Sequence, residues 1–216
     1  MTMLINKYVS SAAFALAFSL SLAGCSRRTS PAPAASVRAA RGDFSVYDVG
    51  GGWRDQTGAV RTLDGLRGTP TVIALMYAHC SSSCPIALAT MKRIAATAPG
   101  VHFVLVSLDP RRDSPGALAA YASEHGLSSD RWTLLSGQDA DVRALAAVLG
   151  VRYRWISSDD VAHANALTLV DATGAIVRRQ AGFDGTDETI RTARDLTAAA
   201  AEAAPRIHDS LNGISQ

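Results

Sequence analysis

Two apolar runs separated by a helical segment most constrain what this chain can fold into. Thr71–Tyr77 and Val101–Leu108 are continuous and partly β-branched, which is typical of strands buried on both faces of a sheet. Between them, Pro85–Ala98 begins with a proline suited to a first helical turn and is followed by Pro99-Gly100. A strand, a helix and a strand in this order predict two parallel strands in one sheet. The apolar positions of the helix are Ile86, Leu88, Met91 and Ile94.

The alternation of strands and helices continues to the end of the chain. Ser114 can cap a helix that ends near Gly126, and glycines also close the next helix and the turn of a hairpin. The pattern predicts an α/β fold, a thioredoxin-like sandwich with a central mixed sheet flanked by helices. The remaining expected elements are a strand at Trp132–Leu135, a helix at Asp139–Leu149, hairpin strands at Ala166–Val170 and Ala175–Arg179, and a helix at Asp187–Ala203.

The N-terminus has the three parts of an export signal. Lys7 precedes an apolar stretch, Val9–Ala23, that is too short and too rich in serine for a membrane span. Its end, Leu22-Ala23-Gly24-Cys25, resembles the lipobox of bacterial lipoproteins, in which the cysteine is acylated and becomes the new N-terminus. We therefore expect a lipid anchor at Cys25. The alternative is an uncleaved signal anchor.

Composition then divides the chain into four parts. We expect a signal peptide at residues 1–24, a lipidated flexible tether at 25–43, one folded domain at 44–204 and a tail at 205–216. The net charge of +2 is spread along the chain, so no basic patch indicates nucleic-acid binding. These features predict a bacterial envelope protein that is anchored in a membrane and faces the periplasm.

Assigning Cys25 to lipid leaves two thiols, Cys80 and Cys84, in an oxidising compartment. Such a pair forms a disulfide by default, but so small a loop adds little stability, which favours a chemical role. Both residues lie between a strand end and a helix start, at the sheet edge where α/β proteins place their sites. A helix N-terminus lowers the pKa of a nearby thiol, and thiolates serve both metal binding and disulfide exchange.

Copper is the metal that suits these donors. Two thiolates alone suit Cu(I), and one added imidazole gives a site that could also hold Cu(II). His163 follows an irregular stretch, Arg152–Ala162, and precedes a strand, which predicts a loop able to fold over the sheet edge. We interpret His102, His125 and His208 as structural, and His79 converges on the same metal only if the backbone turns there.

Several blocks in order resemble the Sco/SenC family of copper-binding assembly factors for cytochrome c oxidase, over roughly residues 44–203. The family often has an aspartate before its late histidine, where this chain has Ala162, which leaves the local electrostatics open. Asp159 and Asp160 are interpreted as residues of a solvated loop. The blocks are Cys80-Ser-Ser-Ser-Cys84-Pro85, Ser107-Leu-Asp-Pro-Arg-Arg-Asp-Ser-Pro115, Trp132-Thr-Leu-Leu-Ser-Gly137, and His163 before Leu169-Val-Asp-Ala-Thr-Gly174.

The resemblance implies a ligand set and a function. The copper ligands become Cys80, Cys84 and His163, and Asp109 becomes an acidic residue beside the site that orients a ligand or a partner. The implied activity is delivery of copper, as Cu(I) or Cu(II), to the binuclear copper site of the oxidase, or thiol reduction at that site. The resemblance therefore favours a metallochaperone over an enzyme and leaves a thiol-disulfide reductase activity open. Its expected partners are the copper-receiving oxidase subunit, thiol reductant proteins and, through Cys25, the membrane.

Three other functional hypotheses use the same cysteines. The main alternative is a thiol-disulfide oxidoreductase that reduces the cysteines of the oxidase subunit without carrying metal, for which His163 is not needed. A peroxidase would oxidise one thiolate to a sulfenic acid and resolve it with the other. A copper or redox sensor would use the whole site, and the sequence does not distinguish it from a chaperone.

Overall fold

The structure is a computed structural model that describes residues 44–80, 84–157, 160–182 and 184–203. The expected signal peptide, the tether with Cys25, the tail and Asp159 lie outside these residues, and the expected domain bounds stay a prediction.

A mixed sheet forms the centre of the fold. Within the described residues it has seven strands in the order β2-β1-β5-β4-β3-β8-β9. β3 pairs in parallel with β4 and β4 in parallel with β5, whereas the outer pairs are antiparallel. The strands are β1 (Trp53–Asp55), β2 (Val60–Arg61), β3 (Thr71–Met76), β4 (His102–Ser107), β5 (Trp132–Ser136), β8 (Ala166–Val170) and β9 (Ile176–Ala181).

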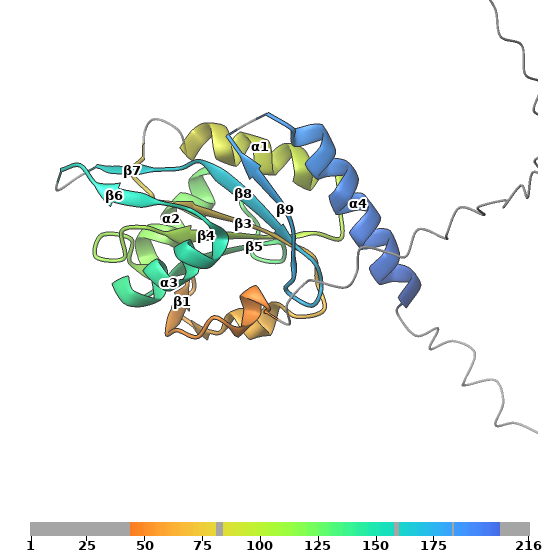
Figure 1. The fold of residues 1–216 in the computed structure, drawn as a ribbon. Coiled ribbons are helices and arrows are strands. Elements are labelled where there is room, and N and C mark those ends of the chain that lie inside the picture. Colours follow the sequence, from red (N-terminus) through yellow and green to blue (C-terminus); the bar gives the residue numbers. More distant parts are fainter. Residues whose placement is uncertain (1–43, 81–83, 158–159, 183, 204–216) are drawn as a thin grey trace, which may run out of the picture. The chain divides into compact units, whose positions relative to one another are not determined.

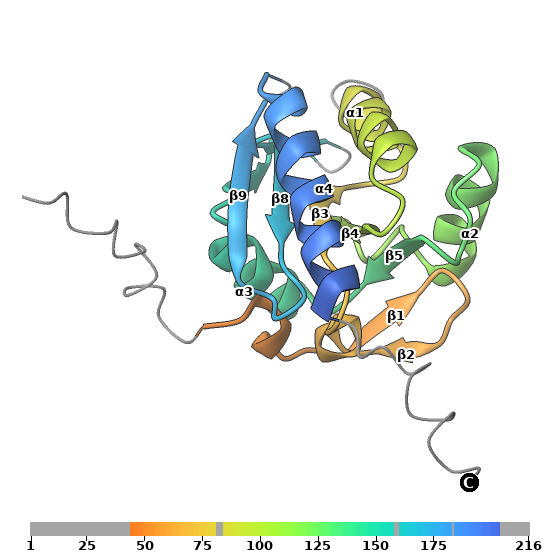
Figure 2. The ribbon, with the colours of Figure 1, turned by 90° about the vertical axis from the view of Figure 1, so that its right-hand side faces the viewer.

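Helices flank this sheet, as the sequence predicts. Figure 1 shows α1 and α4 side by side on one side of the sheet and α3 on the other, and Figure 2 shows α4 running alongside β8 and β9. No described helix is both long and apolar enough to cross a membrane. The helices are α1 (Cys84–Thr97), α2 (Pro115–Glu124), α3 (Asp139–Leu149) and α4 (Thr186–Ala203), with short 3₁₀ turns η1 (Val46–Asp48) and η2 (Leu63–Leu66).

The parallel pair β3 and β4 forms the middle of the core. Every residue of β3 is buried, and five of the six in β4 are buried. The pairing runs in register from Thr71 beside His102 to Met76 beside Ser107, and the Leu108 amide continues it by donating to the Met76 carbonyl at 2.7 Å. The segments that follow both strands therefore leave the sheet at one edge, as the strand, helix and strand pattern predicts.

Helix α1 is held firmly at its C-terminal end. The guanidinium of Arg131 donates to the carbonyl oxygens of Ala95 at 3.0 Å, Ala98 at 2.8 Å and Val101 at 3.2 Å. A cation at this position satisfies carbonyls that the helix leaves open and interacts favourably with the helix dipole. Of the apolar positions predicted for α1, only Ile86 differs, because it is 50% exposed and faces solvent.

Two hairpins were not predicted. Antiparallel strands β1 and β2 extend the sheet beyond β5, and the stretch expected to be irregular contains β6 (Tyr153–Trp155) and β7 (Val161–His163), which pair only with each other. All four strands have three residues or fewer. Strands this short give too few alternating positions to be recognised from periodicity.

The predicted hairpin turn between β8 and β9 is present and closely packed. Gly174 has φ 87°, in the left-handed region that favours glycine. A Cβ at Gly174 would clash with the Ser45 hydroxyl oxygen and lie 2.6 Å from Cδ2 of Tyr47. The turn thus packs directly against the segment that enters η1, whose Val46 amide donates to the Gly174 carbonyl at 2.9 Å.

We expect Gly174→Ala to destabilise the fold more than Gly58→Ala. Both glycines have positive φ, but a Cβ at Gly58 meets no atom within 4 Å, so it carries only the backbone cost of about 1–2 kcal/mol. Overpacking at Gly174 adds roughly 1–3 kcal/mol. Urea unfolding of the two variants measures the difference, and equal losses would contradict the packing described for this turn.

Candidate metal centre

The two cysteines lie at the carboxyl edge of the parallel strands. After β3 the chain turns, with the Cys80 amide donating to the Tyr77 carbonyl at 3.1 Å, and Cys84 is the first residue of α1. Both cysteines are in the thiol form and are largely buried, with exposed fractions of 8% for Cys80 and 3% for Cys84. The predicted disulfide of the oxidised protein stays a prediction.

His163 comes from a strand rather than from the loop that the sequence suggested. It is the last residue of β7 and pairs with Tyr153 of β6. Figure 1 shows this hairpin reaching past the end of the central sheet, on the side where α1 begins. Side chains alternate along a strand, so His163 lies on the same face of β7 as Val161, which is 4% exposed. The hairpin therefore presents His163 to the protein interior.

The three predicted ligands converge. One donor atom from each of Cys80, Cys84 and His163 lies within 4.8 Å of the other two, and no other such group of three occurs among the described residues. The Cys84 sulfur is 3.9 Å from Nε2 of His163, while Nδ1 of the ring is 3.4 Å from the Ala164 carbonyl oxygen. A proton on Nδ1 would be directed to that carbonyl, leaving the Nε2 lone pair facing the sulfurs.

Burial controls the protonation of these groups. It raises the pKa of the Cys84 thiol, and the neighbouring Cys80 side chain raises it further, although the Tyr77 amide opposes the shift. The expected lowering of a thiol pKa at the helix N-terminus is therefore wrong for Cys84, because burial raises its pKa by more than the Tyr77 backbone hydrogen bond lowers it. Burial also lowers the pKa of His163, so its imidazole is neutral at pH 7.

Asp109 lies near the cysteines but outside the group of three donors. It is 1% exposed, its Oδ2 accepts from Nε of Arg112, and the same oxygen is 3.6 Å from Nε2 of His79. Its Oδ1 has no hydrogen-bond partner among the described residues. His79, which directly precedes Cys80, thus turns toward this carboxylate, and its imidazole does not join the three donors.

Two carboxylates hold the cysteine loop: Asp113, which sequence reasoning did not single out, and Asp160, for which it did not predict this contact. Asp113 accepts through Oδ2 from the Ser107 hydroxyl at 2.5 Å and from the Ala78 amide at 3.1 Å, which ties the loop after β4 to the loop after β3. The Tyr77 hydroxyl donates to Oδ1 of Asp160 at 2.7 Å. Asp160 is exposed, as the sequence predicts, and its carboxylate also bonds a residue of the site. Only its position three residues before His163 signalled this role.

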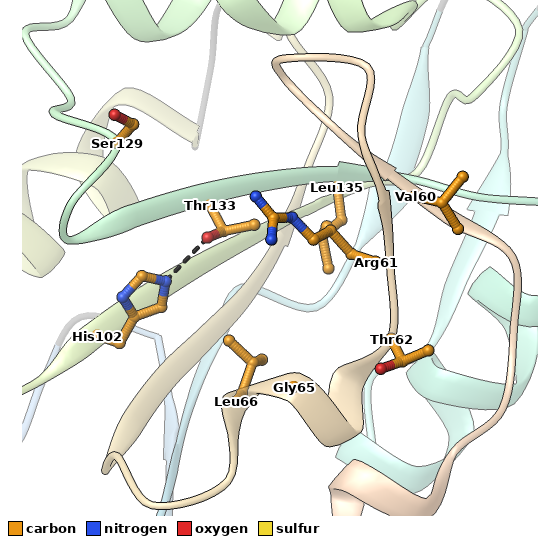
Figure 3. A pocket seen from close by; sticks show the side chains of 9 residues that line it. All are labelled: Val60, Arg61, Thr62, Gly65, Leu66, His102, Ser129, Thr133 and Leu135. Atoms are coloured by element: carbon orange, nitrogen blue, oxygen red, sulfur yellow. Dashed lines mark hydrogen bonds between the residues drawn. The ribbon is translucent and has the colours of Figure 1, made fainter.

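The larger cavities do not enclose the thiols. A hollow of about 330 Å³ lies beside His163 and is lined also by residues 152–154. A larger one, about 440 Å³, lies at the other end of β4, where Figure 3 shows His102 and Arg61 pointing into it. The His102 ring is 2.9 Å from the Thr133 hydroxyl, and burial lowers its pKa. His102 thus has the structural role expected from the sequence.

The donor set fits copper. Two sulfurs and one imidazole, largely shielded from water, suit a soft metal, and the imidazole extends the range to Cu(II). Hard cations such as Mg²⁺ and Ca²⁺ prefer oxygen ligands, which this group does not offer. The arrangement can therefore hold copper through three ligands, or exchange electrons through the two thiols alone.

Comparison with known proteins shows which family this chain matches. The SCO1/SenC family description matches residues 46–200. A SCO1 protein homolog from Bacillus subtilis is 26% identical over 141 residues, which cover 62% of this chain and 73% of the homolog.

Solved structures share the fold. BsSco, described as having a disulfide switch and as a member of the Sco family of cytochrome c oxidase assembly proteins, matches with a TM-score of 0.61 and 23% identity. That match covers 72% of this chain and 94% of BsSco. ScoI of Bradyrhizobium japonicum, solved with copper bound, matches with a TM-score of 0.55 and 23% identity over 68% of this chain and 96% of ScoI. The thioredoxin-like sandwich predicted from the sequence is confirmed.

The raised pKa of Cys84 predicts a distinctive pH profile for its alkylation. Only the thiolate reacts, so the rate of reaction with iodoacetamide should keep rising beyond about pH 10, where an ordinary thiol has levelled off. Mass spectrometry of the reduced, metal-free protein follows each cysteine separately. The same protein in urea is the control and should show the ordinary profile. A folded-state rate that levels off at or below about pH 10 would contradict the raised pKa.

Proposed function

This chain belongs to the SCO1/SenC family, and from that premise we propose that it is an extracytoplasmic copper chaperone for the binuclear copper centre of cytochrome c oxidase. The observation that carries the proposal is the convergence of Cys80, Cys84 and His163 within 4.8 Å. Support also comes from the relatives, since one shares this fold with copper bound and another is described as an oxidase assembly protein.

Copper is the cargo in this proposal, and the residues of the chain receive and release it. Copper binding displaces the proton of the Cys84 thiol, whose pKa is raised, so loading releases protons to solvent. His163 is neutral at pH 7 and offers Nε2 without losing a proton. Delivery is an exchange of copper from these ligands to those of the copper-receiving oxidase subunit, with no turnover chemistry on the chain itself.

A second function is favoured by the proximity of the two thiols. As a thiol-disulfide oxidoreductase, the chain would reduce a disulfide of the oxidase subunit. Cys80 and Cys84 would give up two electrons and two protons, form their own disulfide and leave two thiols on the substrate. Thiol reductant proteins would then restore the pair. Both functions need the cysteines, whereas only copper transport needs His163.

The location follows from the N-terminal segment. We propose that Cys25 carries lipid and tethers the domain to a bacterial membrane on the periplasmic side, where the dithiol meets both copper and oxidants. Residues 25–43 then provide a tether on the order of 20 Å in reach, estimated as a random coil.

His163→Ala distinguishes the two functions. We expect Cu(II) affinity to fall by at least about 100-fold, because an imidazole ligand is lost, while Cu(I) affinity changes far less, because two thiolates suffice for it. Competition titrations with Cu(I) and Cu(II) chelators measure both values, and His102→Gln, at the other end of β4, is the control. Unchanged Cu(II) affinity would remove His163 as a ligand and favour the oxidoreductase.

Cys25→Ser tests the anchor. Without an acylated cysteine the mature chain should leave the membrane fraction and no longer incorporate a labelled fatty acid. Cell fractionation and metabolic labelling measure these outcomes, and the soluble variant should bind copper as the wild type does. A variant that stays in the membrane would instead indicate an uncleaved signal anchor.

A further inference from the structure

The three copper ligands come from two different parts of the fold. Cys80 and Cys84 belong to the segment between β3 and α1, which the central sheet fixes. His163 belongs to the β6–β7 hairpin, whose strands form no ladder with that sheet. The position of the imidazole relative to the sulfurs therefore depends on the two-residue link from His163 to β8 and on side-chain contacts between the hairpin and the rest of the domain.

Tyr77 provides the most direct of these contacts. Its side chain is buried, with the residue 4% exposed, and its hydroxyl donates to Oδ1 of Asp160 at 2.7 Å. The same hydroxyl interacts with the Cys80 side chain and the Val161 backbone. Its ring meets the His163 imidazole edge to face, with centroids 6.3 Å apart. Tyr77 thus lies between the cysteine loop and the strand that carries His163.

Asp160 transmits this contact to the hairpin. It immediately precedes β7, and its carbonyl accepts from the Ile156 amide at 3.0 Å, which extends the pairing of β6 with β7. An anchor on the Asp160 side chain therefore fixes the start of a three-residue strand that ends at His163. Because the strand is so short, its last side chain cannot move independently of its first.

A second attachment is weaker. The Trp155 ring packs against the guanidinium groups of Arg111 and Arg112, at 5.3 and 5.8 Å from the ring centroid. Trp155 is 36% exposed, and cation–π contacts at exposed positions contribute little. A hydrogen bond from a buried hydroxyl to a carboxylate is the stronger interaction. Of these two attachments, the hydrogen bond from the Tyr77 hydroxyl is accordingly the stronger, and it acts together with the burial of Val161 in the core.

We propose that Tyr77 is a positioning residue for the third copper ligand: through Asp160 it holds His163 against the two sulfurs and so makes the site competent for Cu(II). The inference rests on the proposed copper binding and deepens it. Two thiolates bind Cu(I) without help, whereas Cu(II) requires the imidazole. The hydroxyl of Tyr77 therefore selects which oxidation states the site retains.

Tyr77→Phe tests the proposal, because it removes only the hydroxyl oxygen. Cu(II) affinity should fall about tenfold and the thiolate-to-Cu(II) absorption band should weaken, while Cu(I) affinity stays within about twofold. Tyr47→Phe is the matched control, since its buried hydroxyl bonds Thr71 and the Thr69 carbonyl instead. It should leave both affinities unchanged. Equal losses of Cu(I) and Cu(II) affinity in Tyr77→Phe would overturn the proposal.

A double-mutant cycle separates the route through His163 from a direct effect on Cys80. In a His163→Ala background, Tyr77→Phe should have no further effect on copper binding, because the residue that it positions is gone. A full effect in that background would mean that the hydroxyl acts on Cys80, which overturns the proposal. Asp160→Asn keeps an acceptor oxygen and should retain most Cu(II) affinity, whereas Asp160→Ala should resemble Tyr77→Phe.

Hydrogen exchange in the metal-free protein distinguishes failure of this inference from failure of the proposed function. Tyr77→Phe should speed the exchange of the paired β6–β7 amides and leave those of β3 and β4 unchanged. If the wild type binds no copper, the proposed function fails, and this measurement still decides whether Tyr77 holds the hairpin. Unchanged hairpin exchange would overturn the positioning role.

Discussion

The parallel pairing of β3 with β4 is the constraint on which the site depends. It sends the two following loops off the same edge of the sheet, and the buried carboxylate of Asp113 then joins them by accepting from Ser107 and Ala78. The cysteine loop starts from this fixed point. All of α1 and β4 lie between the cysteine motif and the Asp109–Asp113 turn along the chain. Without the shared edge, the motif and the turn would not meet.

The division of the ligands between sheet edge and hairpin gives the site two kinds of support. The thiols depend on the core, since Cys84 begins α1 and Cys80 follows β3 by one turn. The imidazole depends on a hairpin held by side chains. Substitutions in the core should therefore disturb all three donors together, whereas removal of the Tyr77 hydroxyl or the Trp155 ring should act mainly on His163.

Sequence reasoning predicted the central sheet apart from β1 and β2, it placed the two cysteines at the sheet edge, and the family resemblance added His163. Long apolar runs reveal β3 and β4, and a cysteine motif between a strand and a helix belongs at a sheet edge. The β6–β7 hairpin was missed because three residues are too few to show alternation. The Tyr77–Asp160 hydrogen bond was missed because it joins residues 83 positions apart. The raised pKa of Cys84 depends on burial, which a helix N-terminus in the sequence does not reveal.

The hydrogen bonds of Arg131 at the C-terminal end of α1 determine which end of this helix can move. Arg131 precedes β5 and bonds three carbonyls: that of Ala95 in the last turn of α1, that of Ala98 just after the helix, and that of Val101 before β4. One side chain therefore fixes the C-terminal end of α1 together with the turn that leads into β4, whereas Cys84 lies at the opposite end of the helix. Any adjustment of the sulfur positions when a metal enters or leaves should therefore fall on the first turn of α1 and the loop before it.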